Sequence, residues 1–156
     1  MEMELLPHVG VATFRLGMSA EEATRAAEEL GLLATGAEAE SDPGQILFTH
    51  DEFRMNFTLG FIKGALGNVE VWRFRNEDAD VRVTLDGLDV FRTPSEELLQ
   101  QFEERGHTTE ENDLGFDALP DLKVIFANNS SFEYPVDEDG DPLYFDYVLV
   151  TTEPVG

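Results

Sequence analysis

The side chains best suited to metal or acid–base chemistry are the three histidines, His8, His50 and His107. An imidazole beside carboxylates can bind a metal ion or act as a general base, and two acids follow His50 directly. No second histidine stands at metal-ligand spacing, so an exposed loop histidine is the favoured interpretation. His107 could pair with Glu110 or Glu111, but its place just after a predicted helix favours a capping role instead.

Three alternating aspartates, Asp137, Asp139 and Asp141, suggest calcium chemistry. An EF-hand loop requires Gly at its sixth position and Glu at its twelfth, where this chain has Pro142 and Val148. The spacing therefore predicts a solvated hairpin turn. No metal site and no cofactor are predicted.

Motifs of several common enzyme classes are missing from the chain: the Gly-x-Ser-x-Gly elbow, the Gly-rich phosphate loop and the His-Glu-x-x-His helix. The adjacent acids Glu21-Glu22 and Glu103-Glu104 lie in predicted helices, where neighbouring side chains diverge. Such a pair cannot flank one bond as acid and base. We expect a non-catalytic protein, while a site assembled only by folding stays open.

Aromatic side chains offer a different chemistry, the anchoring of a protein partner. Trp72 is the single tryptophan, in a predicted strand where Val69 and Val71 take the inward positions. We expect Trp72 and Phe74 on the opposite face, with a core position for Trp72 as the alternative. The tyrosines of the second half raise the same question. The predicted partner-binding residues are Trp72, Phe74, Tyr134, Tyr144, Tyr147, Asp137, Asp139 and Asp141.

Acidic residues dominate the composition, with 33 Asp plus Glu against 10 Lys plus Arg and a formal net charge of −23. Direct binding to nucleic acid or to an anionic membrane needs clustered cations and is unfavourable. A basic protein partner fits better, and solubility alone is the alternative explanation of the charge.

The compartment is predicted from the first residues and from the cysteine count. Acids occupy positions 2 and 4, where a secretory signal needs basic residues, and no long apolar run follows. The chain has no cysteine, which excludes a disulfide framework and a thiolate site. We expect a cytoplasmic protein.

Helices and strands must position these side chains. Ser19 and Glu22 make a predicted capping box at the start of a helix that Gly31 ends. Residues 34–45 are predicted as a loop, and strict alternation over 53–61 predicts a strand with one buried face. The other predicted elements are a turn at 64–68, strands at 69–74 and 81–85, a helix capped by Thr93 with Glu96 completing the box, and strands at 122–126, 132–134 and 144–152.

The two helices align as an internal repeat. Glu21-Glu22 matches Glu96-Glu97 (96 − 21 = 75), and the same offset superposes Gly31 on Gly106. We expect an α+β fold, a tandem repeat of two helix-plus-antiparallel-sheet units at 1–80 and 81–156, packed as one globular unit. The sheet face away from the helices would then be open to a partner.

The stretch Phe14-Arg15-Leu16-Gly17-Met18-Ser19-Ala20-Glu21-Glu22-Ala23, with Gly31 closing the helix, resembles the opening motif of the BamE (SmpA/OmlA) superfamily. In that family this motif begins a helical segment packed on a small antiparallel sheet. A tandem of two such units is similar in plan to the beta-lactamase inhibitory proteins. The resemblance implies the fold and a protein-binding sheet face, and it assigns no individual contact residue.

The sequence therefore predicts an inhibitor or immunity-type protein, in which sheet-face aromatics anchor a partner and acidic loops steer it. One alternative is an acidic nucleic-acid mimic that captures basic DNA- or RNA-binding proteins. Another is a small-ligand-binding domain or an enzyme of unknown substrate.

Overall fold

The computed structural model describes residues 1–37, 44–111, 116–128, 134–153 and 155. These residues form a mixed α/β fold that is mostly β, with two helices and 13 strands in two sheets. In chain order the elements are β1 (Glu2–Leu6), β2 (Gly10–Val11), β3 (Phe14–Arg15), α1 (Ala20–Glu29), β4 (Leu33–Ala37), β5 (Gly44–His50), β6 (Met55–Ile62), β7 (Ala65–Trp72), β8 (Arg82–Leu85), β9 (Leu88–Asp89), α2 (Ser95–Glu104), β10 (Glu110–Glu111), β11 (Asp117–Leu119), β12 (Val124–Ala127) and β13 (Tyr147–Thr151).

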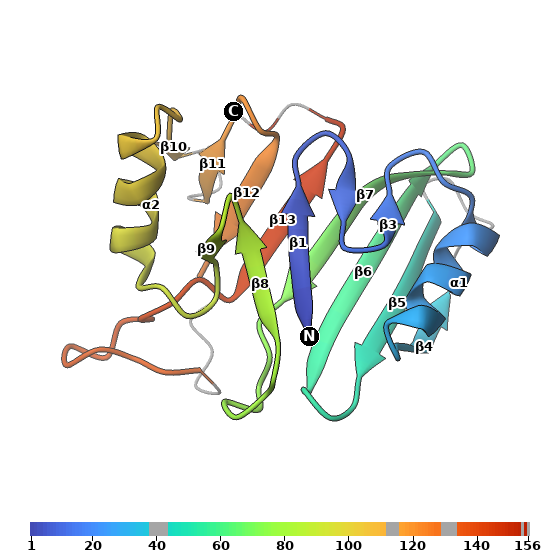
Figure 1. The fold of residues 1–156 in the computed structure, drawn as a ribbon, viewed down its shortest axis with the longest axis horizontal. Coiled ribbons are helices and arrows are strands. Elements are labelled where there is room, and N and C mark those ends of the chain that lie inside the picture. Colours follow the sequence, from blue (N-terminus) through green and yellow to red (C-terminus); the bar gives the residue numbers. More distant parts are fainter. Residues whose placement is uncertain (38–43, 112–115, 129–133, 154, 156) are drawn as a thin grey trace.

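The sheets form two layers (Figure 1). The large sheet has eight strands in the order β10-β11-β12-β13-β7-β6-β5-β4, and the small sheet has five in the order β3-β2-β1-β8-β9. In Figure 1 the small sheet lies in front of the large one, with α1 and α2 to either side of it. We call the face of the large sheet turned toward the small sheet its inner face, and the opposite face its outer face.

The hydrophobic core fills the space between the layers. Alternate residues of β7, such as Val69 and Val71, are fully buried and join one cluster with Met3 and Leu5 of the small sheet. At the α2 end, the ring of Phe102 stacks on Phe126 of β12 with 5.9 Å between centroids. Since side chains of a strand alternate between faces, the residues between these inward positions lie on the outer face.

The two helices differ in how they begin. At α1, Ser19 accepts a hydrogen bond from the amide of Glu22 and donates its own amide to the Glu22 carboxylate, both at 3.2 Å, so the predicted capping box is confirmed. At α2 the predicted box is wrong. Pro94 has the extended backbone of a cap (ψ 138°), so the helix starts at Ser95, whose amide donates to the carbonyl of Leu143. A tertiary contact there replaces the local cap.

The β6–β7 hairpin confirms the strand expected at 53–61, but the predictions for the segments on either side of it are wrong. Lys63 and Gly64 both have positive φ (52° and 82°), so a two-residue turn returns the chain earlier than the predicted 64–68 turn. The loop expected at 34–45 is wrong at both ends, because β4 continues to Ala37 and β5 begins at Gly44. Pairing with β5 outweighs the weak strand propensity of β4, and residues 38–43 lie outside the described residues.

Other strands confirm or contradict smaller predictions made from the sequence. β8 and β12 lie where strands were expected, whereas β1 was missed because its alternation is hidden in an acidic N-terminus. β13 is shorter than 144–152 and is not covered on both sides, since Tyr147 and Leu149 are only half-buried. Of the strand expected at 132–134, the first two residues lie outside the described residues and Tyr134 is not in a strand.

Each half of the chain supplies consecutive strands to the large sheet. β4 to β7 form one antiparallel run and β10 to β13 another, and the two runs meet where β13 pairs with β7. In the small sheet, β1 pairs with β8 in parallel, with Met3 opposite Val83. The tandem repeat stays a prediction. Neither helix in the described part of the chain is long and apolar enough to cross a membrane.

Candidate functional site

Within the described residues, no helix or strand covers the side chains on the outer face of the large sheet. Both helices and the small sheet lie on the inner face (Figure 1). The outward positions of the four central strands, read from the register and the burial pattern, are Gln45, Leu47 and Thr49 of β5, Asn56, Thr58 and Gly60 of β6, Asn68, Glu70 and Trp72 of β7, and Tyr147, Leu149 and Thr151 of β13.

Trp72, Tyr147 and Glu70 form a cluster on this face, which we call the open cluster. Trp72 and Tyr147 are directly opposed across β7 and β13, and their rings meet edge to face with centroids 5.2 Å apart. The Tyr147 hydroxyl donates a 2.8 Å hydrogen bond to Glu70 Oε1. Burial of this hydroxyl, followed by the charge of Glu70 and this hydrogen bond, raises the pKa of Tyr147 well above its ordinary value. The tyrosine is thus held neutral and fixed in place.

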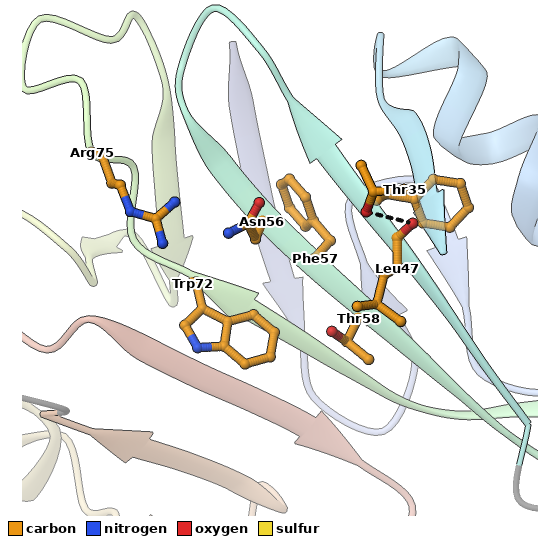
Figure 2. Close-up of a pocket in the computed structure, with 8 residues that line it drawn as sticks. Thr35, Leu47, Asn56, Phe57, Thr58, Trp72 and Arg75 are labelled. Atoms are coloured by element: carbon orange, nitrogen blue, oxygen red, sulfur yellow. Dashed lines mark hydrogen bonds between the residues drawn. The ribbon is translucent and has the colours of Figure 1, made fainter. Parts of the chain in front are cut away.

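A hollow of about 310 Å³ opens beside Trp72 (Figure 2). Thr49 Oγ1 lies 3.0 Å from Asn56 Oδ1 and 3.1 Å from the carbonyl oxygen of Met55, and its single proton can be donated to either acceptor. The Thr35 hydroxyl donates to the carbonyl of Leu47 at 3.3 Å, as the dashed line in Figure 2 shows. The lining comes from β4 to β7 and the residues just after β7: Thr35, Leu47, Phe48, Asn56, Phe57, Thr58, Trp72 and Arg75.

The outer face is poor in acids compared with the rest of the chain. Glu70 is the single acid among the outward positions of the four central strands, although the chain carries 33 Asp plus Glu. Acids crowd the β10 end of the sheet instead, where burial and then repulsion by Glu111 raise the pKa of Asp117. The centre of this face is therefore poor in acidic charge, although the chain as a whole is strongly acidic.

Phe74 corrects one of the expectations about this face. It was expected beside Trp72, but its side chain is 0% exposed and packs edge to face on Phe91 at 6.3 Å. Strand β7 ends at Trp72, although the next amide, that of Arg73, still donates to the carbonyl of Asp146 in register with the Trp72–Tyr147 pair. The strand alternation does not extend to residue 74, so Phe74 turns into the core.

Tyr134 and Tyr144 lie around Arg73 rather than beside Trp72. The Arg73 guanidinium is 4.9 Å from the Tyr144 ring centre, 5.7 Å from that of Tyr134 and 4.4 Å from that of Phe74. Arg73 is 1% exposed and binds Glu77 through both terminal nitrogens, while its Nε donates to the Phe91 carbonyl at 2.8 Å. We call Arg73, Phe74, Glu77, Tyr134 and Tyr144 the closed cluster.

The aspartates at 137, 139 and 141 form an exposed turn, as the sequence predicted. Asp137 Oδ1 accepts hydrogen bonds from the amides of Asp139 and Asp141 at 2.9 and 3.0 Å. One carboxylate oxygen from each aspartate lies within 4.8 Å of the others. Exposed acids gathered by a turn need a further ligand-directed feature to define a metal site, so we assign them to the acidic surface.

The histidines find partners that the sequence did not indicate. The Phe53 amide donates to His50 Nδ1 at 3.2 Å and the two rings stack at 3.8 Å, which makes His50 part of the turn before β6. His107 donates Nδ1 to the Asp121 carboxylate at 3.0 Å rather than pairing with Glu110 or Glu111. His8 Nε2 donates to the Asp121 backbone carbonyl at 3.0 Å. No local sequence pattern could identify Asp121 as the partner of His8, since 113 residues separate the two.

The fold and the site together define a two-layer α/β protein with an acid-poor, partly aromatic sheet face. No protein-family model matches the chain, and no curated protein or solved structure matches it either. The BamE-type resemblance therefore rests on the motif Phe14 to Ala23 alone.

Proposed function

We propose that this chain is a non-catalytic protein-binding module of the inhibitor or immunity type, which binds its partner on the outer face of the large sheet. The observation that carries the proposal is the acid-poor centre of this face in a chain of net charge −23. A surface maintained only for solubility would have acids there too, whereas the core of an interface is depleted in charge.

The composition of the open cluster supports an anchoring role. Tryptophan and tyrosine are enriched among residues that contribute most to binding energy, and such residues lie in hollows near the centre of an interface. Trp72 lines such a hollow, and so does Leu47, which lies across β6 from it and is 40% exposed. Acids elsewhere on the chain, including the exposed aspartates of the 137–141 turn, would accelerate encounter with a basic partner.

The proposal includes the tandem organisation. We propose that residues 1–80 and 81–156 are two related helix-plus-sheet units that share the large sheet. The equal contribution of β4–β7 and β10–β13, joined at β7 and β13, supports this view. The outer face would then be a joint product of both halves, with Trp72 from one and Tyr147 from the other.

A second candidate is an acidic nucleic-acid mimic, and the net charge favours it. Such a mimic would bind basic nucleic-acid-binding proteins through the acids themselves, and Trp72 would contribute little. The two proposals therefore differ in their dependence on salt and on Trp72.

A pull-down from lysate of the source organism distinguishes them. The baits are the wild type, Trp72→Ala and the control Val9→Ala, which removes a 48% exposed side chain remote from the outer face. We expect one protein retained by the wild type and by Val9→Ala through high-salt washing, and lost with Trp72→Ala.

If all three baits retain the same proteins equally and salt releases these proteins, the outer-face proposal is rejected and the mimic is supported. Each bait is first checked by circular dichroism, so that a folding defect is not read as lost binding.

A further inference from the structure

The edge of the large sheet formed by β4, which we call the β4 edge, is long and uncharged. β4 is the last strand in the order of this sheet, and within the described residues it pairs with β5 alone. Its five residues, Leu33–Ala37, include no charge and no proline. The other three edges, β10, β3 and β9, have two residues each, and both residues of β10 are glutamates. Short and charged edges resist pairing with another chain, and the β4 edge has neither protection.

The backbone of β4 specifies what can cover this edge. Successive N–H and C=O groups of an antiparallel strand point alternately toward its neighbour and away from it. The groups that point away from β5 face no strand in the described ranges. Helix α1 lies on the inner side of this end of the sheet, in front of β4 in Figure 1. The β4–β5 register shifts between Ala34 and Gly36, so the regular part of the edge is its first part. An extended segment is the complement of such a row of backbone groups.

The β4 edge continues the outer face that carries Trp72. The strand registers place one residue from each of five strands in a single row, where the β6–β7 register is followed one pair beyond its end. From β13 to β4 this row is Tyr147, Trp72, Asn56, Thr49 and Leu33. Leu33 is 55% exposed, more than any other large apolar residue in the described ranges. Three strand spacings, about 14 Å, separate β4 from β7, so one partner can cover Trp72 and reach the edge.

Charge distinguishes a partner protein from a second copy of this chain. Two copies joined edge to edge at β4 would each carry a net charge of −23. They would also bring together the exposed acids Glu28 and Glu29, which end α1 just before β4. Like charges at such a junction repel, whereas a neutral or basic segment is attracted.

We infer that the partner bound on the outer face also adds an extended strand to the β4 edge. The added segment is free of acids and places an apolar residue beside Leu33. The inference rests on the proposed function, since it names the part of the partner that is recognised. Hydrogen bonds between the two backbones supply affinity, and the alternate side chains that face Leu33 supply specificity.

The test uses a phage library of random dodecapeptides, panned against the full chain. An enriched peptide is synthesised unmodified and in two N-methylated forms, one methylated on odd residues and one on even residues. Because alternate amides of a strand point to opposite edges, only one form blocks pairing with β4. We expect that form to bind about tenfold or more weakly, while the other form binds as the unmodified peptide does. In the ¹⁵N-labelled chain, the bound peptide should slow hydrogen exchange at Leu33 or Ala34.

Two proline variants test the same contact from the side of the chain. The amides of Leu33 and Ala34 are adjacent and point in opposite directions, so Leu33→Pro and Ala34→Pro remove one donor to β5 and one donor to the open edge. Urea denaturation identifies the open-edge variant as the more stable of the two. We expect this variant to lose peptide binding. Leu33→Ala measures the share of the side chain, and Val9→Ala should bind as the wild type does.

Four results would overturn the inference: no enriched peptide, equal binding of both N-methylated forms, peptide binding retained by the open-edge proline variant, or self-association of the free chain with the β4 amides protected. The last result would make a second copy the occupant. The proposed function survives all four if Trp72→Ala still abolishes capture of a protein in the pull-down. Conversely, if peptides pair with β4 but no capture depends on Trp72, the outer-face proposal fails and the partner strand loses its source.

Discussion

Trp72 and Arg73 are neighbours in the chain, yet they belong to two aromatic clusters with opposite surroundings. In the open cluster, Trp72 and Tyr147 are half-buried on the outer face of the large sheet. In the closed cluster, aromatic rings surround the Arg73 guanidinium, which is 1% exposed and paired with Glu77.

The difference separates two uses of the same residue types. A buried cation is tolerated only when its charge and its donors are satisfied, and the closed cluster meets both conditions for Arg73. It therefore serves stability. The open cluster leaves an indole in contact with solvent beside a hollow, and this arrangement gains most when a partner covers it. Mutations in the two clusters should accordingly change different measurements.

The largest expected effect is that of Phe74→Ala in the closed cluster. Phe74 is fully buried between Phe91 and the Arg73 and Arg92 guanidinium groups. Removing its ring leaves a cavity, and we expect the free energy of unfolding to fall by about 3–5 kcal/mol in urea denaturation. Phe74→Leu should cost under about 1.5 kcal/mol. If Phe74→Ala lowered the free energy of unfolding by only about 1.5 kcal/mol, Phe74 would not be a core residue, and its predicted role on the outer face would be restored.

Glu77→Ala should have the next largest effect, because it leaves the buried Arg73 charge without its carboxylate. Water reaches Glu77, whose side chain is 47% exposed, so we expect a loss of about 2–3 kcal/mol in unfolding free energy, below the range for fully buried pairs. Asp78→Ala removes the same charge from an exposed site and should change stability by less than about 0.5 kcal/mol. Equal effects of the two variants would show that the Glu77 pair is not stabilising.

The two clusters also show what could be predicted from the sequence. Period-two alternation over residues 53–61 predicted β6, and Ser19 with Glu22 predicted the start of α1, because both signals are local. The sequence also placed Val69 and Val71 inward and Trp72 outward, and the structure confirms this arrangement.

The position of Phe74 could not be predicted, because its side chain packs on Phe91 and Arg92, which are distant in the chain. The same holds for α2, whose first amide is satisfied by Leu143, and for the contacts of His107 and His8 with Asp121. Each error involves a tertiary contact that replaces a local rule.

Trp72→Ala should affect stability less than either change in the closed cluster. Since the side chain is half-buried, we expect a loss of about 1–2 kcal/mol in unfolding free energy, less than for a fully buried aromatic. The affinity for the partner should fall by about 30-fold or more, equivalent to about 2 kcal/mol. Trp72→Phe should restore part of the affinity. Titration calorimetry with the captured partner measures both, and unchanged affinity for Trp72→Ala would remove the distinction between the clusters.

The smallest expected effect is that of Tyr147→Phe, and it depends on pH. At pH 8 the variant lacks the hydrogen bond to Glu70, and we expect a loss of about 1 kcal/mol in unfolding free energy. Above roughly pH 10 the unfolded wild type loses the Tyr147 proton, whereas in the folded chain the raised pKa keeps it bound. Ionisation then stabilises only the unfolded wild type, so the difference from Tyr147→Phe should shrink as the pH rises.

Urea denaturation of both proteins at pH 8 and pH 10.5 measures this difference. Tyr134 and Tyr144 are present in both proteins, so their titration cancels in the comparison. A difference that stays constant with pH would mean that the Tyr147 hydroxyl ionises equally well in the folded and unfolded chains. Glu70 would then not fix the Tyr147 hydroxyl by a hydrogen bond. Trp72 would therefore pack against a mobile ring and would not be pre-positioned for a partner.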